Sequence, residues 1–280
     1  MFELIATKND AGRTLFKLLV KYLNNVPISK IEKLFRKKDI KVNNVRNNKK
    51  DYLVQEGDHI VVYGIEQAQK TEVIKYKKGD LDILYEDQNI LVINKKTAVE
   101  VHGSDDCLDF QVLAYLKYKQ TDSFKPSHVG RLDKETSGII LYAKTYQALV
   151  QLNEAHSKFT KKYQFLSDFN EAKREVVLYM FKDYETGKMK ASRTERPNSK
   201  QAITILTFDG KRKLAEIKTG RKHQIRVALQ NIGKPIYGDK KYGGKKAERL
   251  MLHSYYLKLD GLNNELKYLN KVDFYCLPKW

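Results

Sequence analysis

The sequence contains little cysteine and no long apolar segment. Cys107 and Cys276 are the only cysteines among 280 residues, and they lie far apart. This argues against a disulfide framework and fits a reducing, cytoplasmic compartment. No apolar run approaches the ~20 residues that span a bilayer. No basic segment followed by an apolar one opens the sequence, so we expect neither a membrane span nor a secretory signal.

Motifs for metal and nucleotide binding are also missing. The six histidines show no metal-ligand spacing with cysteine or carboxylate residues, so we expect no metal site. Neither a GxxxxGKS/T loop nor a GxGxxG fingerprint occurs, so we expect no nucleotide cofactor.

The charge balance is strongly basic. Lysine and arginine total 53 against 34 acidic residues, which gives a formal net charge of +19. Such an excess predicts a polyanionic partner, either nucleic acid or an anionic membrane, although a lysine-rich solvated surface has the same composition. No amphipathic, aromatic-rich anchor helix is present, so nucleic acid is favoured. The hydrophobic content of 41% is enough for a buried core.

Residues 1–63 are predicted to form a small basic module. Apolar residues recur at helical spacing before Pro27, which ends this first helix. The pattern of a capping box from Ser29 to Glu32 predicts the start of a second helix. Short strands are expected after it, at Ile40–Val42 and at residues 59–62.

The second helix would carry a row of basic side chains on one face. Such a row suits a phosphate backbone, although an ordinary solvated helix face has the same composition. A turn is expected at Asn43–Asn44, because asparagine tolerates positive φ. The basic residues are Lys30, Lys33, Arg36, Lys37 and Lys38.

The rest of the chain is predicted to form a linker and a larger domain. Residues 64–80 are polar and charged, which is typical of a flexible linker. Residues 81–280 have many expected strands and few helices without regular alternation, which predicts an α+β fold with a largely antiparallel sheet. Helices are expected at Leu108–Lys117, Tyr146–Ala155 and His223–Asn231. The expected strands are Ile90–Asn94, Val99–His102, Ile139–Ala143, Lys162–Leu166, Glu175–Met180, Ala202–Phe208, Ala215–Lys218 and Met251–Leu259.

Two segments of the larger domain hold the residues best suited to chemistry. His128–Lys144, HVGRLDKETSGIILYAK, places Asp133 in a polar turn just before an apolar strand. Thr219–Gly243, TGRKHQIRVALQNIGKPIYGDKKYG, opens a helix with arginine, lysine, histidine and glutamine. A lone carboxylate with positioned arginines suits chemistry on a polyanion. A turn aspartate that only accepts backbone hydrogen bonds has the same local pattern.

Together these two segments resemble the RluA-type pseudouridine synthases, in particular the RluC and RluD branch that modifies ribosomal RNA. The resemblance covers most of the chain, and it implies the pseudouridine synthase fold, conversion of flipped uridines to pseudouridine in RNA, and no cofactor. It implies that Asp133 is the catalytic aspartate. Glycosidases usually need two carboxylates, but here the leaving uracil is a stabilised anion that stays bound, so one can suffice.

The resemblance implies roles for further residues. Tyr163 would stack on the target uracil, with its hydroxyl as a candidate proton acceptor, and Ile225 would pack under the tyrosine ring. Arg226 would pair with Asp133 in a bidentate geometry that orients the carboxylate. Arg131 would enter the space that the flipped nucleotide leaves. Arg221, Lys222 and His223 would contact phosphates or form the start of the helix. His223 is not expected to be catalytic.

The first module resembles the S4 RNA-binding module, and the chain departs from both families in places. Asn44 stands where the S4 turn usually has glycine. Gly130 stands where the RluA branch usually has a histidine before the arginine, and the role of the nearby His128 is left open. The loop Lys95–Ala98 lacks the usual proline and glycine, which puts its rigidity in doubt.

The favoured function is therefore isomerisation of uridines in large-subunit rRNA by a cytoplasmic, monomeric enzyme. A tRNA pseudouridine synthase is the nearest alternative. A non-catalytic RNA-binding or ribosome-assembly protein with the same fold is a second alternative. The presence of Asp133, Tyr163 and Arg226 argues against it.

Overall fold

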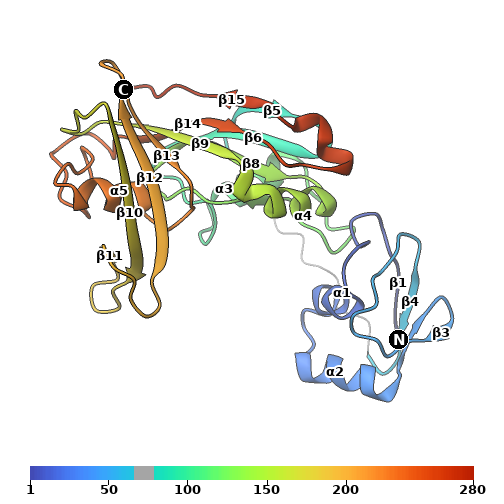
Figure 1. Ribbon diagram of the computed structural model, residues 1–280. Helices are drawn as coiled ribbons and strands as arrows, with labels where there is room; N and C mark the ends of the chain where they lie inside the picture. Colours follow the sequence, from blue (N-terminus) through green and yellow to red (C-terminus); the bar gives the residue numbers. More distant parts are fainter. Residues whose placement is uncertain (66–78) are drawn as a thin grey trace. The chain divides into compact units, whose positions relative to one another are not determined.

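The computed structural model describes residues 1–65 and 79–280 (Figure 1). Most of the predicted linker, residues 64–80, lies outside the described residues. None of the described helices is long and apolar enough to cross a membrane.

The chain forms two compact units. The first contains Met1–Tyr76 and also the short segments Leu116–Pro126 and Thr145–Gln147. The predicted domains, 1–63 and 81–280, placed both short segments in the larger domain. The predicted domain limits stay a prediction. The second unit contains Lys77–Tyr115, Ser127–Lys144 and Ala148–Trp280.

The first unit contains a four-stranded antiparallel sheet in the order β1-β4-β2-β3, together with two helices. Leucines of α1 and the apolar side chains of α2 are buried in one core with β2 and β4. Asn43 and Asn44 have positive φ of 50° and 66°, which confirms the predicted turn. The elements are β1 (Phe2–Ile5), α1 (Leu15–Tyr22), α2 (Ile28–Lys37), β2 (Ile40–Val42), β3 (Val45–Arg46) and β4 (His59–Val62).

The second helix begins earlier than the capping-box pattern predicted. Helix α2 starts at Ile28 with Pro27 as its N-cap, and no side chain caps it. The carbonyl of Pro27 accepts hydrogen bonds from the N–H groups of Lys30 and Ile31 at 2.9 and 3.2 Å. Ser29 is therefore already inside the helix, where its hydroxyl cannot cap the first turn, and the predicted capping box is wrong.

The second unit is built on an 11-stranded sheet in the order β11-β10-β12-β13-β9-β14-β8-β6-β5, with β15 on β14 and β7 on β8. All of these pairs are antiparallel except β14 with β8, so the predicted α+β class is confirmed. Strand β10 pairs with β12 along most of its length and with β11 at its end (Figure 1). The strands are β5 (Asp82–Glu86), β6 (Ile90–Lys95), β7 (Ser127–Val129), β8 (Ser137–Ala143), β9 (Thr160–Phe165), β10 (Lys173–Lys182), β11 (Met189–Ser192), β12 (Lys200–Phe208), β13 (Lys213–Ile217), β14 (Leu252–Lys258) and β15 (Asp273–Tyr275).

Three helices and two 3-10 turns complete this unit. Helix α4 covers one face of the sheet, where Ala148, Leu152 and Phe159 pack in one core with side chains of β6, β8 and β14. Helix α5 contacts β10, β11 and β12. The elements are α3 (Leu108–Tyr115), α4 (Tyr146–Ala155), η1 (His156–Lys158), α5 (Gln224–Asn231) and η2 (Asn264–Leu269).

The predicted strand Val99–His102 is wrong, because this segment is irregular. Ala98 has a positive φ of 63°, which turns the chain. The ammonium of Lys95 then donates hydrogen bonds to the carbonyls of Lys96 and Val99, at 3.0 and 2.8 Å. Carbonyls bound in this way leave the segment curled around a side chain rather than paired in the sheet.

Strands β8 and β14 approach closely at the start of β8. Ser137 and Gly138 pair in parallel with His253 and Ser254. Gly138 has a φ of 110°, and a Cβ there would lie 2.2 Å from the carbonyl oxygen of Ser254. Only glycine fits at this position. The polar turn before β8 is thereby fixed against the middle of the sheet.

Candidate active site

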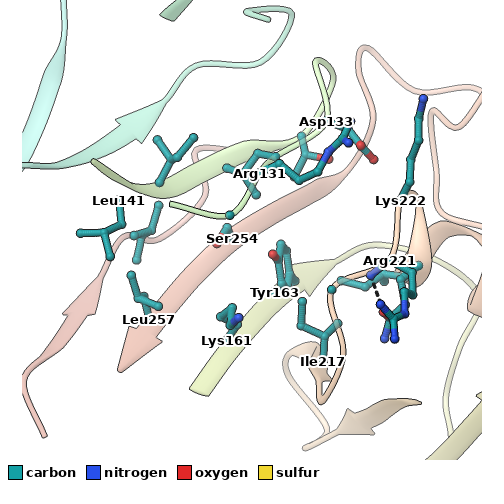
Figure 2. A pocket seen from close by; sticks show the side chains of 18 of the residues that line it. Arg131, Asp133, Leu141, Lys161, Tyr163, Ile217, Arg221, Lys222, Ser254 and Leu257 are labelled. Carbon is teal, nitrogen blue, oxygen red and sulfur yellow. Dashed lines mark hydrogen bonds between the residues drawn. The ribbon is translucent and has the colours of Figure 1, made fainter. Parts of the chain in front are cut away.

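The predicted site residues of the larger domain line one cavity of about 380 Å³. Figure 2 shows Asp133 and Arg131 on the turn before β8, Tyr163 on β9, and Arg221 and Lys222 on the segment before α5. The predicted residues that line the cavity are Arg131, Asp133, Tyr163, Arg221, Lys222, Ile225 and Arg226.

The turn that carries Asp133 is anchored by a buried lysine. Lys95 is 1% exposed, and its ammonium also donates a hydrogen bond of 3.0 Å to the carbonyl of Lys134. The hydroxyl of Thr97 donates to the carbonyl of Glu135 at 2.8 Å. Burial lowers the pKa of Lys95 to about 8, although the charges of nearby carboxylates oppose the shift. The loop without proline and glycine is thus held by side chains instead.

We expect Lys95→Met to destabilise the protein. Three carbonyls would lose a charged donor, which should lower the free energy of unfolding by on the order of 2 kcal/mol. Urea unfolding measures this effect. Lys96→Met is the matched control, because the Lys96 side chain is 60% exposed. Equal stability of the two variants would contradict the anchoring role.

The guanidinium of Arg226 forms its two short hydrogen bonds with Asp239, not with Asp133. Its Nε and Nη2 donate to Oδ2 and Oδ1 of Asp239 at 2.7 and 2.8 Å. Its Nη1 lies 3.9 Å from Oδ2 of Asp133. The predicted bidentate pair with Asp133 is therefore corrected: the fork of the guanidinium faces Asp239, and the third nitrogen faces Asp133.

Asp239 is itself held in place by the backbone. It is 1% exposed, and its Oδ1 accepts hydrogen bonds from the N–H groups of Lys241 and Tyr242 at 3.0 and 3.1 Å. Burial alone would lower the pKa of Arg226, but the hydrogen bonds and charge of Asp239 outweigh it and raise that pKa. The cation beside Asp133 is thus permanent and fixed in direction.

His223 also faces Asp133, a position that the sequence did not indicate. It is the N-cap of α5 with a φ of 57°, and its Nε2 lies 3.7 Å from Oδ2 of Asp133. Its Nδ1 forms a 2.7 Å hydrogen bond with the hydroxyl of Tyr242. Burial lowers the pKa of His223 to about 4, while the charge of Asp133 opposes that shift. At neutral pH the carboxylate thus has one cation and one neutral imidazole beside it.

Tyr163 lies in the cavity as a protonated phenol. Its side chain is 8% exposed. Burial, and next the charge of Asp133, raise the pKa of Tyr163 to about 12, although a hydrogen bond with Ser254 opposes this. The phenolate that a proton acceptor of this kind would need is therefore scarce at neutral pH. A flat aromatic face beside Asp133 remains well suited to stacking on a base.

The segment before α5 is shaped by Gln224. Its side-chain oxygen accepts from the hydroxyl of Thr219 at 2.8 Å and from the N–H of Arg221 at 3.0 Å. Its nitrogen donates to the carbonyl of Ile203 at 2.9 Å. This buried amide joins the tight turn to β12, so the segment TGRKHQ has a structural role beside any contact with RNA.

No group of three or more histidine, cysteine, aspartate or glutamate side chains within the described residues could hold a metal ion. The cavity is lined by the carboxylate of Asp133, the phenol of Tyr163, several basic side chains, and the imidazoles of His102, His128, His156 and His223. The basic side chains of this set suit a negatively charged substrate.

Comparison with known proteins identifies the family. The chain matches the RNA pseudouridylate synthase model over residues 89–231. It is 35% identical to an "Uncharacterized RNA pseudouridine synthase" of Mycoplasma capricolum over 302 residues, which covers 100% of this chain and 99% of that protein. It is 29% identical to "Ribosomal large subunit pseudouridine synthase C" of Pasteurella multocida, over 92% of this chain and 85% of that protein.

A solved structure is also similar in fold. The chain resembles "Human RNA Pseudouridylate Synthase Domain Containing 4" with a TM-score of 0.55 and 26% identity, over 71% of this chain and 89% of that one. The chain belongs to the RNA pseudouridylate synthase family. It is an RNA pseudouridine synthase, an isomerase that acts on uridine in RNA, and the predicted reaction class is confirmed.

Proposed function

We propose that this enzyme modifies uridines of large-subunit rRNA and that Asp133 is its catalytic aspartate. The observation that carries the second part is the place of Asp133: its carboxylate lines the cavity beside Tyr163, with Arg226 and His223 at 3.9 and 3.7 Å. A flipped uridine stacked on the tyrosine ring would bring its sugar to this carboxylate. Asp133 then acts on C1′ as the bond to N1 breaks.

The proposed RNA substrate is supported by relatives. Proteins of Pasteurella multocida and Rickettsia typhi that are 29% and 31% identical to this chain carry the name "Ribosomal large subunit pseudouridine synthase C". Mapping of pseudouridines in rRNA and tRNA from cells with and without the gene tests the substrate. Sites that disappear only from tRNA would overturn the rRNA proposal and leave the reaction class intact.

We further propose that the first unit binds RNA as an S4-like module. The basic residues of α2 lie on its exposed side, opposite the buried Ile31, Leu34 and Phe35. A row of this kind suits successive phosphates of a backbone, where it would release counterions. The exposed basic residues are Lys30, Lys33, Arg36, Lys37 and Lys38. A monomeric state and a cytoplasmic location stay predictions.

Changing Lys30, Lys33, Arg36 and Lys37 together to glutamine should weaken RNA binding and flatten its salt dependence. Each lost phosphate contact should reduce the slope of log K against log salt by about 0.7 to 0.9. Filter binding at several salt concentrations measures this. A matched control changes Lys173, Lys267, Lys271 and Lys279, which are exposed on the second unit. Equal slopes in the two variants would show that α2 acts only through the overall charge.

A further inference from the structure

A second basic group lines the cavity away from Asp133. Lys161 lies on β9 two residues before Tyr163, so both side chains are on the same face of the strand. Both line the cavity, and Figure 2 shows them side by side along β9 with Leu257 nearby. The ammonium of Lys161 donates a 3.0 Å hydrogen bond to the carbonyl of His156. It also lies 3.2 Å from Nε2 of that imidazole.

This cation has no carboxylate partner in an ion pair within the described residues 1–65 and 79–280. Burial alone lowers the pKa of Lys161 to about 8. Burial, and next the charge of Lys161, lower the pKa of His156 to about 4. Near neutral pH the cavity therefore holds an ammonium beside a neutral imidazole. A partly buried charge without a counter-charge is costly, so a negative partner that arrives with the substrate would be bound strongly.

The turn before Asp133 is packed directly on this pair. Gly130 has a φ of 73°, and a Cβ at this position would lie 2.6 Å from Nε2 of His156. The imidazole thus occupies the space that a side chain at 130 would need. Neighbouring wall residues are apolar and include Phe159, Leu141 and Leu257. Lys161 and His156 both lie against the ring of Phe159, so they place polar groups beside this apolar wall.

The reaction supplies a negative partner at this point. When the C1′–N1 bond breaks, its electron pair leaves with uracil, and the charge spreads over N1 and the carbonyl oxygens. The pair is used again when C5 joins C1′. The C5 proton then leaves to solvent and N1 takes up a proton, so charge and atoms balance. Between these steps the base is an anion held in the cavity, away from bulk water.

We propose that the ammonium of Lys161 binds a carbonyl oxygen of the flipped uracil and stabilises the detached base as an anion. The inference rests on the proposed function, because it needs the base stacked on Tyr163 with its sugar at Asp133. Lys161 keeps its proton throughout. His156 is a positioning residue that fixes the direction of the ammonium. A preorganised donor is effective here because charge develops at its acceptor only after the bond breaks.

Lys161→Met tests the proposal, because it keeps the length of the side chain and removes the charge. We expect the single-turnover rate to fall about 10²-fold or more, as for the loss of one preorganised donor to a developing anion. Lys162→Met is the matched control. Lys162 is the next residue, on the opposite face of β9, and lies near Glu216 at 4.0 Å. Both variants lose one positive charge, so their RNA affinities should agree within a few-fold.

A substrate change separates this role from a structural one. Fluorine at C5 withdraws electrons, so 5-fluorouracil leaves as a more stable anion and needs less help. The defect of Lys161→Met in glycosidic bond cleavage should shrink with 5-fluorouridine RNA, measured by digestion and mass spectrometry. An equal defect with both substrates would overturn the proposal. Lys161→Arg should restore most of the rate, and Lys161→Gln replaces the methionine variant if thermal unfolding shows that it is misfolded.

The outcomes also separate this proposal from the one on which it rests. A wild-type enzyme that releases no tritium from C5-labelled rRNA refutes the proposed substrate. An active wild type with Lys161→Met as fast as Lys162→Met refutes only the role of Lys161. A methionine variant whose whole defect lies in RNA affinity would make Lys161 a binding residue and overturn its action on the anion.

Discussion

Asp133→Ala should abolish isomerisation and leave RNA affinity within a few-fold of the wild type. The carboxylate lies in the cavity, where it faces the tyrosine ring and the third nitrogen of Arg226. Its proposed work is at the sugar carbon, not at a phosphate, so its loss should stop bond exchange without a loss of binding. Tritium release from RNA labelled at uracil C5 is the measurement, because only isomerisation frees that hydrogen.

The matched control for this variant is Glu135→Ala. Glu135 lies two residues further in the same turn, and its side chain is exposed while its backbone carbonyl binds Thr97. Both variants lose one negative charge from the same loop. Residual activity of Asp133→Ala above ~1% would remove it from covalent catalysis, because catalysts of that kind lose far more on deletion. Equal losses in the two variants would point to a damaged turn instead.

The sequence predicted the elements that periodicity and local chemistry define. Apolar spacing indicated α1, and the apolar run after the polar turn indicated β8, which is buried along its whole length. Asp133 and Arg226 from the two motif segments, and Tyr163 from the strand between them, line one cavity. These residues sit in local patterns, namely a turn before a strand, a strand opening and a helix start, so their places follow from short stretches of chain.

The errors arose where a side chain from elsewhere decides the local structure. The curled segment after Ala98 depends on Lys95, whose charged end binds carbonyls of two neighbours and of Lys134. Nothing in the periodicity of residues 99–102 indicates this. The short strands β5, β7, β11 and β15 were missed for a related reason. They pair at edges or as additions to longer strands, so they need little apolar alternation of their own.

The partner of Arg226 was missed because no residue of the loop that supplies it was expected in the site. Asp239 lies 13 residues after Arg226 along the chain, in the loop PIYGDKKYG. The loop brings a buried carboxylate to the guanidinium, and two backbone N–H groups hold it there. A loop of this kind has no regular sequence pattern, so the contact between Arg226 and Asp239 could not be predicted from it. The resemblance to the family pointed to Asp133 as the partner instead.

Arg226→Lys should be a poor catalyst although it keeps the positive charge. We expect its rate to lie about 10²-fold or more below that of the wild type, which is the loss expected for a misplaced catalytic group. An ammonium keeps the charge but lacks the planar fork that binds Asp239 through two nitrogens. Without the fork, the third nitrogen is no longer directed at Asp133. RNA affinity should change much less than the rate. Single-turnover kinetics and filter binding compare lysine and alanine variants with the wild type.

Loss of stability has to be separated from loss of catalysis in this pair. The side chains of Arg226 and Asp239 are only 8% and 0% exposed, so removing one partner leaves a buried charge, at a cost of about 3 to 5 kcal/mol. The double change Arg226→Met with Asp239→Asn removes both charges. It keeps an amide oxygen that can accept from the N–H groups of Lys241 and Tyr242. We expect this double variant to regain much of the thermal stability that Arg226→Met alone loses.

The same double variant should remain catalytically defective. If the pair only held the fold together, the rate would recover along with the melting temperature. If the guanidinium acts on Asp133, the rate stays low while stability and RNA binding return, because the guanidinium no longer faces the carboxylate. A near wild-type rate in either Arg226→Lys or the double variant would assign Arg226 to the scaffold. The 3.9 Å approach of Arg226 to Asp133 would then have no part in the reaction.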